Sequence, residues 1–231
     1  TTLDGKAVFA LMGTDHSKVK TDGLDSLKSA YQYTMNLNSS FTGDDNLYVR
    51  LRSGNSTSNF VNKDFGTYLS MGTEYGDLLK VDKIWYTFPV GDSNTVWVGP
   101  KIENYYMHGT TPSIYKPVTK QFTLGGNGEA YGASTNSGAG WAYNADNGFA
   151  FSSNVVSQQN GTSNGLLTDQ SKTSWATQAG YTTDQWSVSA LINQKYNSWA
   201  DEYFHTVNHG AGNGNYTAYG LRAWWRPAET G

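Results

Sequence analysis

The feature that most constrains the fold of this chain is an alternation of apolar and polar side chains that recurs in ten segments. Segment 31–38 is the clearest, because four apolar side chains alternate with four polar ones: Tyr31, Tyr33, Met35 and Leu37 against Gln32, Thr34, Asn36 and Asn38. A period of two residues places successive side chains on opposite faces of a β-strand. The pattern therefore predicts strands that have one apolar and one polar face.

Eight more segments share this period, at residues 47–52, 83–88, 96–102, 141–143, 149–151, 175–181, 186–192 and 216–225. Arg50 and Arg52 fall on the polar face of the first of these. In segment 96–102 the period assigns Val98 and Ile102 to the apolar face and Lys101 to the polar face. The remaining segment, 6–12, is apolar on both faces, so its periodicity is the weakest of the ten.

The connections between these segments alternate between short and long. Four short ones have the Gly, Asn, Asp and Thr composition of tight hairpin turns, at residues 43–45, 91–93, 144–147 and 182–184. The links between them, at residues 14–30, 55–76, 104–136, 157–172 and 196–214, are long and rich in Gly, Ser, Asn and Thr. An outer-membrane barrel has short turns at one rim and long loops at the other. This alternation therefore predicts an all-β fold, an antiparallel transmembrane β-barrel.

Composition agrees with strands and excludes several other classes. The chain has 231 residues and a mean hydropathy of -0.57, with no apolar run near the roughly 20 residues that a membrane-spanning helix needs. Barrel strands need no such run, because closure satisfies their backbone hydrogen bonds. A net charge of -3 gives no global electrostatic case for nucleic-acid binding. The absence of cysteine excludes a disulfide framework and a thiolate metal site.

Aromatic residues gather near the short turns. Seven of them lie within a few residues of one: Phe41, Phe88, Tyr143, Phe149, Tyr181, Trp186 and Trp225. Ordinary strand packing accounts for any single one of them. Because all seven lie at a similar distance from the short turns, they favour an aromatic girdle at a membrane interface. Trp97 lies at the same level with inward parity, which indicates either a residue of the pore lining or a shifted register.

The two ends of the chain suggest that the barrel is larger than this sequence. The chain begins at Thr1 without Met or a signal peptide, although an outer-membrane protein is exported, which indicates that an upstream segment has been removed. Its last residues, 226–231, have the composition of a short turn that opens another hairpin. We therefore expect residues 1–231 to form one barrel domain of ten strands, an incomplete portion of a larger barrel.

Four sequence blocks occur in order along the chain: YTMNLNSSFTGDDNLYVRLRSGN at 33–55, VDKIWYTFPVGDSNTVWVGP at 81–100, a segment ending in TPSIY at 107–115, and LRAWWRPAETG at 221–231. Together they resemble the barrel of cyanobacterial outer-membrane porins, the iron-uptake porin family that is related to carbohydrate-selective porins. The resemblance extends over nearly the whole chain. It implies that the signal peptide, the periplasmic surface-layer-homology domain, the coiled coil and the further strands of such porins lie outside these 231 residues.

The resemblance also implies a function. Porins of this family form a water-filled channel for the passive diffusion of small solutes and inorganic ions across the outer membrane, and the related family carries carbohydrates. We expect contact with outer-membrane lipid, and analogy with other porins predicts a homotrimer. The transported solute is not implied, and neither is an iron site.

Five basic residues on the polar faces are the candidates for the pore lining: Arg50, Arg52, Lys83, Lys101 and Arg222. A charge on the lipid face costs roughly 2–4 kcal/mol near the bilayer midplane, so we expect them to face the lumen. Lumenal cations predict a mild anion preference unless acidic loop residues offset it. The alternative is that they are solvated wall residues that balance Asp82 and Glu103.

The longest link, Asn104 to Glu129, is a candidate constriction loop. A long porin loop can fold into the channel, and the two prolines of this link would restrain its backbone for that task. Tyr115, Lys116 and Lys120 are the candidate constriction residues. The alternative is an ordinary external loop.

Catalytic functions find little support. The chain has no cysteine nucleophile, no G-x-S-x-G elbow, no Walker-type loop and no dinucleotide fingerprint, so we expect no catalytic residue and no cofactor. His205 and His209 lie near Asp201 and Glu202 and could bind a transition metal if the loop folded suitably. Such residues in a polar loop are more often solvated, and we assign no metal site.

A second function class is a soluble or surface-exposed β-sandwich that binds glycans on exposed aromatic side chains. The two classes differ in what covers each face of the strands. A barrel exposes its apolar face to lipid, whereas a sandwich buries that face and leaves the arginine-bearing face in water.

Overall fold

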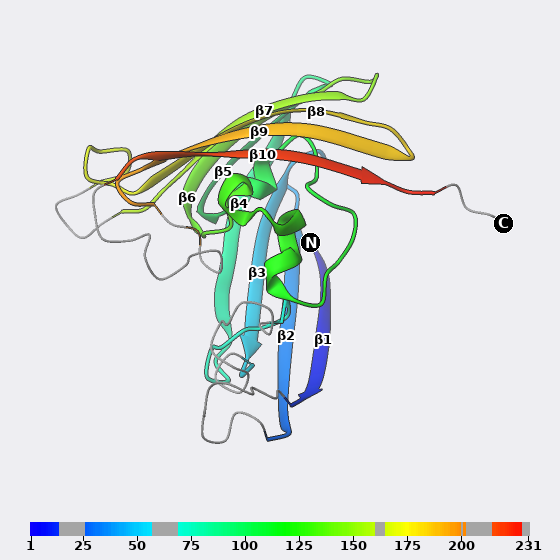
Figure 1. The fold of residues 1–231 in the computed structure, drawn as a ribbon, viewed down its shortest axis with the longest axis vertical. Coiled ribbons are helices and arrows are strands. Elements are labelled where there is room, and N and C mark those ends of the chain that lie inside the picture. The colour runs from blue at the N-terminus through cyan, green and yellow to red at the C-terminus, as the bar shows by residue number, and fades with distance from the viewer. Residues whose placement is uncertain (14–25, 57–68, 160–164, 200, 202–213, 228–231) are drawn as a thin grey trace.

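The computed structural model describes residues 1–13, 26–56, 69–159, 165–199, 201 and 214–227. Ten antiparallel strands form one sheet in which each strand pairs with its neighbours in the chain (Figure 1). The strands are β1 (Thr2–Met12), β2 (Lys28–Ser39), β3 (Asn46–Gly54), β4 (Lys80–Val90), β5 (Asn94–Ile102), β6 (Asn136–Asn144), β7 (Phe149–Ser157), β8 (Thr173–Thr182), β9 (Trp186–Tyr196) and β10 (Tyr216–Trp225). The ten predicted strands are confirmed.

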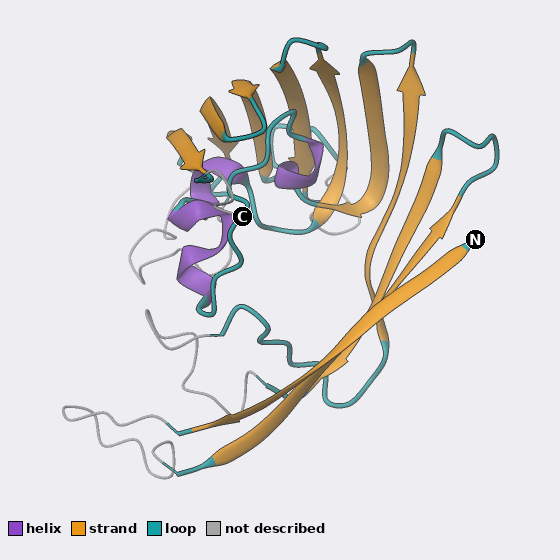
Figure 2. Cartoon of the chain, turned by 90° about the vertical axis from the view of Figure 1, so that its right-hand side faces the viewer, coloured by secondary structure: helices purple, strands orange, loops and turns teal. Residues whose placement is uncertain are grey.

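The four predicted hairpin turns are also confirmed, between β2 and β3, β4 and β5, β6 and β7, and β8 and β9. Gly91 and Gly148 lie in two of these turns with φ of 66° and 92°, a backbone region that glycine enters without steric cost. Because consecutive strands run in opposite directions, the short turns share one rim of the sheet and the long connections share the other (Figure 2).

The sheet is strongly curved and open (Figure 2). Its edges are β1, which pairs with β2, and β10, which pairs with β9. Within the described ranges the strands form one sheet, and no second sheet packs against it, as it would in a sandwich. No helix in that part of the chain is both long enough and apolar enough to cross a membrane.

The two faces of the sheet differ in chemistry. In β9 the residues from Ser187 to Lys195 alternate without exception, so that five are buried on the concave face and those between them are exposed on the convex face. The exposed side chains of the convex face are apolar or aromatic over all parts of the sheet: Leu3, Phe9, Leu11, Tyr33, Val98, Trp141, Phe149, Trp175, Tyr181, Trp186, Val188, Ile192, Tyr219, Leu221 and Trp225. The buried positions of the concave face are mostly Ser, Thr, Asn, Gln, Lys and Ala.

One strand end departs from the predicted alternation. The register of β5 shifts against both neighbours, because Lys101 pairs with Ile84 of β4 and Ile102 pairs with Asn136 of β6 after a bulge. An extra residue in a strand inverts the facing of every residue beyond it. Ile102 is consequently buried in the interior, so its assignment to the outward apolar face was wrong. Lys101, which pairs with the outward-facing Ile84, likewise departs from its predicted place on the inward polar face. The inward parity of Trp97 is confirmed, since it packs against the same interior cluster.

The turn between β2 and β3 depends on one buried carboxylate. Asp45 accepts hydrogen bonds from the backbone N–H groups of Phe41 and Thr42, at 2.9 and 2.7 Å, and from the hydroxyl groups of Ser40 and Tyr86, at 2.7 and 2.6 Å. The hydrogen bond from Tyr86 and those from the turn hold the pKa of Asp45 well below its ordinary range.

Acidification should therefore weaken this hairpin. A carboxyl group whose pKa is lower in the folded than in the unfolded chain stabilises the fold above its unfolded pKa of about 4, and that contribution is lost as pH falls below it. Asp45→Asn should be less stable than the parent protein at pH 7, and the difference should shrink toward pH 2 to 3 in urea unfolding. Asp44→Asn, at a neighbouring exposed position, is the control, and equal pH dependence in the two variants would contradict the assignment.

Candidate functional site

The candidate site lies on the concave face, beneath the long connection from Glu103 to Thr135, here called the inner loop. It contains the short 3-10 helices η1 (Asn104–Met107) and η2 (Lys120–Gly126) and one turn of helix, α1 (Gly128–Tyr131). Helix η1 contacts strands β5 to β8, and α1 contacts β9 and β10 (Figure 2). The longest link therefore lies against the concave face of the sheet.

Polar side chains of the wall hold the backbone of the inner loop. The Gln178 amide both accepts from the Thr110 N–H, at 2.9 Å, and donates to the Thr110 carbonyl, at 3.2 Å. Asn193 donates to the carbonyl of Ala130 at 2.9 Å, and Ser152 accepts from a further backbone N–H of the loop. Buried backbone groups need such partners. The Ser, Asn and Gln side chains of the concave face therefore bind the backbone of this loop and fix its position.

Two apolar clusters fill the space between the inner loop and the wall. The first consists of Trp85, Ile102, Met107, Val156 and Trp199. The second consists of Ala130, Tyr131, Ala176 and Leu191. Each combines residues of the inner loop with residues of several strands, so the loop is part of the protein's core and is not an external loop.

A buried ion pair fixes the end of the inner loop. Lys195 of β9 and Asp201 have no exposed side-chain surface and form a salt bridge. The Asp201 carboxylate also accepts from the backbone N–H groups of Ala133 and Ser134, at 2.7 and 2.8 Å. Lys195 in turn donates to the Ser174 hydroxyl at 3.1 Å. This pair was not predicted as a structural lock, because its partners meet only when the loop docks on the wall.

A second lysine joins the two ends of the inner loop. The Lys83 ammonium group of β4 bonds both to the carboxylate of Glu103 and to the hydroxyl of Thr135. The Thr135 hydroxyl also donates to Glu103 at 2.6 Å. Since Glu103 and Thr135 are the first and last residues of the loop, Lys83 closes its base.

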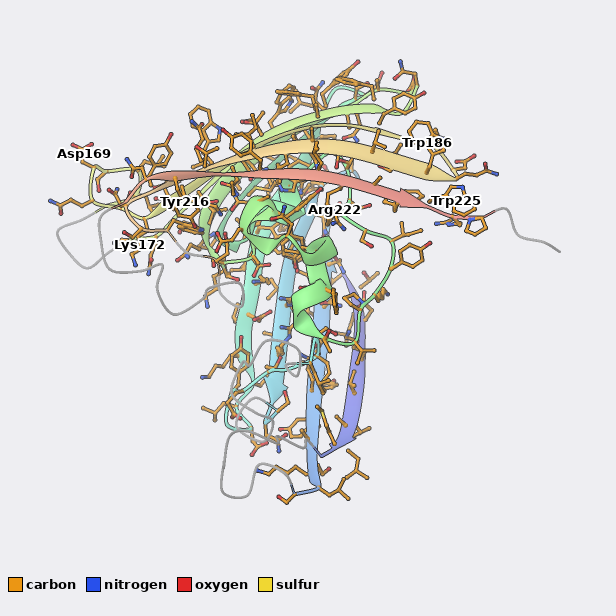
Figure 3. The ribbon with its side chains drawn as sticks, viewed as in Figure 1. Asp169, Lys172, Trp186, Tyr216, Arg222 and Trp225 are labelled. Carbon is orange, nitrogen blue, oxygen red and sulfur yellow. The ribbon has the colours of Figure 1, made fainter. Side chains whose placement is uncertain are left out.

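The predicted basic residues largely converge on one cavity of about 780 Å³. Arg50, Arg52, Lys83 and Lys101 line it, together with the acidic residues Glu74, Asp82 and Glu103. Four basic and three acidic side chains leave one net positive charge. Arg222 lies elsewhere, next to the inner loop, where it donates to the carbonyl groups of Pro112, at 3.3 Å, and Gly125 (Figure 3).

The cations of this cavity are paired to different degrees. Arg50 forms a salt bridge with Asp82 and donates to the Tyr106 hydroxyl of η1 at 3.0 Å. Arg52 lies 3.6 Å from the same carboxylate. The predicted alternative, in which the basic residues balance Asp82 and Glu103, therefore describes the contacts of Arg50 and Lys83 best.

The predicted constriction residues lie away from this cavity. Tyr115 and Lys116 are exposed, and the Tyr115 hydroxyl donates to the carbonyl of Trp225 at 2.7 Å. Lys120 lies in η2, and its side chain is outside the described part of the structure. The aromatic residues of the inner loop that pack against the strands are instead Tyr105 and Tyr106, whose ring centres are 4.1 Å apart. The only sequence signal for them is an aromatic pair directly after the end of a predicted strand.

Burial keeps the ionisable groups of η1 and its neighbourhood neutral. It raises the pKa of Tyr106 to about 12 and that of Tyr105 well above its ordinary value. It also lowers the pKa of His108 to about 4, so this imidazole is neutral at pH 7. One ring nitrogen of His108 lies 3.1 Å from the Tyr131 carbonyl and the other 3.1 Å from the Asn154 amide. A neutral ring that donates to the carbonyl and accepts from the amide satisfies both.

The residues considered for a metal are only partly within the described ranges. Glu202, His205 and His209 lie outside them, and Asp201 is engaged by Lys195. In the described part of the chain, no three His, Cys, Asp or Glu side chains come together in a way that could hold a metal ion.

The aromatic residues near the short turns lie on the convex face. Phe41, Phe149, Tyr181, Trp186 and Trp225 are exposed, whereas Phe88 and Tyr143 are half-buried. Figure 3 shows Trp186 and Trp225 at one end of β9 and β10, and Tyr216 and Lys172 at the opposite end. Aromatic rings therefore lie along the rim of the sheet that carries the short turns, which is where the aromatic girdle was predicted.

Comparisons with known proteins add no family assignment, because no protein-family model matches this chain and a search of curated proteins finds no match.

Proposed function

We propose that this protein forms the wall of a water-filled outer-membrane channel through which small solutes and inorganic ions diffuse passively. The observation that carries the proposal is the polarity of the sheet, which is apolar and exposed on the convex face and polar on the concave face. A soluble protein buries its apolar strand face, whereas a barrel wall in a bilayer presents that face to lipid. The resemblance to cyanobacterial porins supports the same function, as passive transport and not catalysis.

The proposal requires a closed barrel. The unpaired backbone groups at the edges of β1 and β10 cannot face hydrocarbon, where each unsatisfied group costs several kcal/mol. The functional barrel therefore pairs both edges, either with each other or with further strands. The inner loop then lies inside the lumen and narrows it, and the cavity between the loop and β3 to β5 is the section of the water path that the basic residues line.

The test is single-channel conductance of the protein in planar lipid bilayers, with the reversal potential measured under a salt gradient. Discrete, lasting conductance steps are expected. Because the cavity has one net positive charge, the reversal potential should show only a weak anion preference. Protein that is shown to be folded in detergent and gives no steps would refute the channel. A strong cation preference would keep the channel and refute only the proposed role of the basic residues.

The alternative, a glycan-binding module with aromatic platforms, has less support because the sheet has no partner sheet within the described residues. Solubility distinguishes the two. The channel protein should need detergent to stay monodisperse, whereas a binding module should not.

A further inference from the structure

His108 directly follows η1 and belongs to a chain of hydrogen bonds that joins the inner loop to the wall. One end of the chain is the backbone carbonyl of Ser174 in β8, which accepts from the Asn104 amide at 3.0 Å. The same amide donates to the side-chain oxygen of Asn154 in β7 at 2.9 Å, so the Asn154 nitrogen faces Nδ1 of His108 at 3.1 Å. The other end is the carbonyl of Tyr131 in α1, 3.1 Å from Nε2 of His108.

The two backbone carbonyl groups at the ends fix the direction of every bond in this chain. A carbonyl oxygen only accepts, so Asn104 turns its amide nitrogen toward Ser174, and Nε2 of His108 carries the hydrogen that points to Tyr131. Asn154 then donates to Nδ1, which is therefore the acceptor. The chain has a place for one proton on the imidazole ring and none for a second.

A second proton on His108 breaks this chain whichever way the amides turn. With the amides as they are, the N–H at Nδ1 would meet the amide nitrogen of Asn154. If Asn154 turned to accept this proton, its nitrogen would meet that of Asn104, and if Asn104 also turned, its oxygen would face the Ser174 carbonyl. Asn104 and Asn154 are both buried, so water has little access to replace the lost bonds, and unpaired buried groups are costly.

The groups that face His108 also oppose a positive charge on the ring. α1 contributes the Tyr131 ring, whose centre lies 5.6 Å from that of the imidazole, and β7 contributes the uncharged amide of Asn154. β9 contributes the ammonium group of Lys195, whose partner carboxylate is Asp201. Burial and repulsion by Lys195 lower the pKa of His108 to about 4, whereas an imidazole in water has a pKa of about 6.5.

We propose that His108 is a proton-sensitive contact of the inner loop, and that its protonation releases the loop segment around it from the wall. A released histidine binds a proton more readily than the docked one, so release becomes more favourable as pH falls below about 6.5 and levels off near pH 4. Within this range the ratio of released to docked segments should rise about tenfold per pH unit. A wider lumen at acidic pH rests on the function proposed above, but the release does not.

Backbone hydrogen exchange of the detergent-solubilised protein measures the release. The N–H groups of Gly109 and Thr110 bond to Ser152 and Gln178 of the wall, so they exchange when the segment leaves it. The exchange rate of the parent protein, divided by that of His108→Gln at the same pH, should rise about 20-fold from pH 7 to pH 5. The division removes the pH dependence of the chemical exchange step, which the two proteins share.

Two variants make this test specific. Glutamine at position 108 can donate to Tyr131 and accept from Asn154, but it does not titrate in this range. Asn154→Asp acts in the opposite direction, because a carboxylate still accepts from Asn104 and also accepts from a protonated ring. It should raise the pKa of His108 and abolish the release by acid. Circular dichroism of each variant checks that the sheet is intact, and the same pH dependence in the parent and both variants would overturn the proposal.

Conductance in planar bilayers separates this inference from the proposed function. The current of the parent protein should grow from pH 7 to pH 5, and that of His108→Gln should not. Acid-dependent exchange in folded protein that does not conduct would keep the release and refute the channel. Lasting conductance steps together with exchange that has the same pH dependence in parent and variants would keep the channel and refute the release.

Discussion

Replacement of Lys195 by methionine is expected to lower the free energy of unfolding by about 3–5 kcal/mol, because it leaves the carboxylate of Asp201 buried without its counter-charge. The same substitution should loosen the inner loop, since Asp201 holds the backbone of Ala133 and Ser134. In planar bilayers the variant should give a larger and noisier conductance than the parent protein. Urea unfolding in detergent measures the first effect.

The matched control for this prediction is the double variant Lys195→Met with Asp201→Asn. Asparagine removes the buried charge but keeps a carbonyl oxygen that can accept from Ala133 and Ser134. Most of the lost stability should therefore return, and the conductance should move back toward that of the parent. If the double variant were as unstable as the single one, the buried charge would not be the cause.

Replacement of Ile192 by arginine is expected to destabilise the protein in lipid bilayers by about 2–4 kcal/mol. Ile192 is exposed on the convex face near the middle of β9, with 49% of its surface accessible. If that face lies in lipid, the new charge would be placed in hydrocarbon. Unfolding in liposomes, followed by the mobility difference between folded and unfolded protein on gels, measures the effect.

Leu166→Arg provides the control for Ile192→Arg. Leu166 has a similar exposed fraction, 44%, but lies in the connection before β8 and not in a strand. Its replacement should change stability little, because surface substitutions in water are usually within about 0.5 kcal/mol. Equal, small effects of both substitutions would place the convex face in water and would contradict the membrane proposal.

The strands and turns could be predicted from the sequence because their signals are local. The two-residue period of segments such as 186–192 reports directly which side chains share a face. Turn composition reports where a hairpin reverses, as at Gly91 and Gly148. Neither signal depends on contacts between distant parts of the chain, so the order of all ten strands followed from the pattern.

The assignment of side chains to the two faces was wrong where counting residues along a single strand was not enough. The bulge in β5 adds one residue between Gly99 and Ile102. Gly99 and Pro100 are residue types that occur at bulges, but they do not by themselves fix where the register shifts. The predicted faces of Lys101 and Ile102 were inverted as a result. The bulge becomes evident only when the register with both neighbouring strands is known.

The site residues were predicted in part for a related reason. The inward positions of Arg50, Arg52 and Lys83 follow from parity, and these residues line one cavity. Lys101 also borders that cavity, but from the end of β5 beyond the bulge, where parity no longer holds. The residues that meet them come from the inner loop, which has no periodicity and therefore gives no signal of its orientation. Tyr106 was therefore not predicted as a partner of Arg50. Glu103, which the alternative interpretation named as a balancing charge, does pair with Lys83. Tyr115 and Lys116 were chosen for their chemistry, but they are exposed away from the cavity.

Sequence by itself determined the strand order, the alternation of short and long connections and the polarity of the two faces, because each is encoded within a few neighbouring residues. Tertiary structure decided where the inner loop lies and which carboxylates and carbonyl groups the cations of the wall bind. Those outcomes depend on residues far apart in the chain, such as Lys83 with Thr135 and Arg222 with Gly125. Their contacts form only when the loop docks on the curved sheet, because burial makes an unpaired polar group costly and so favours these pairings.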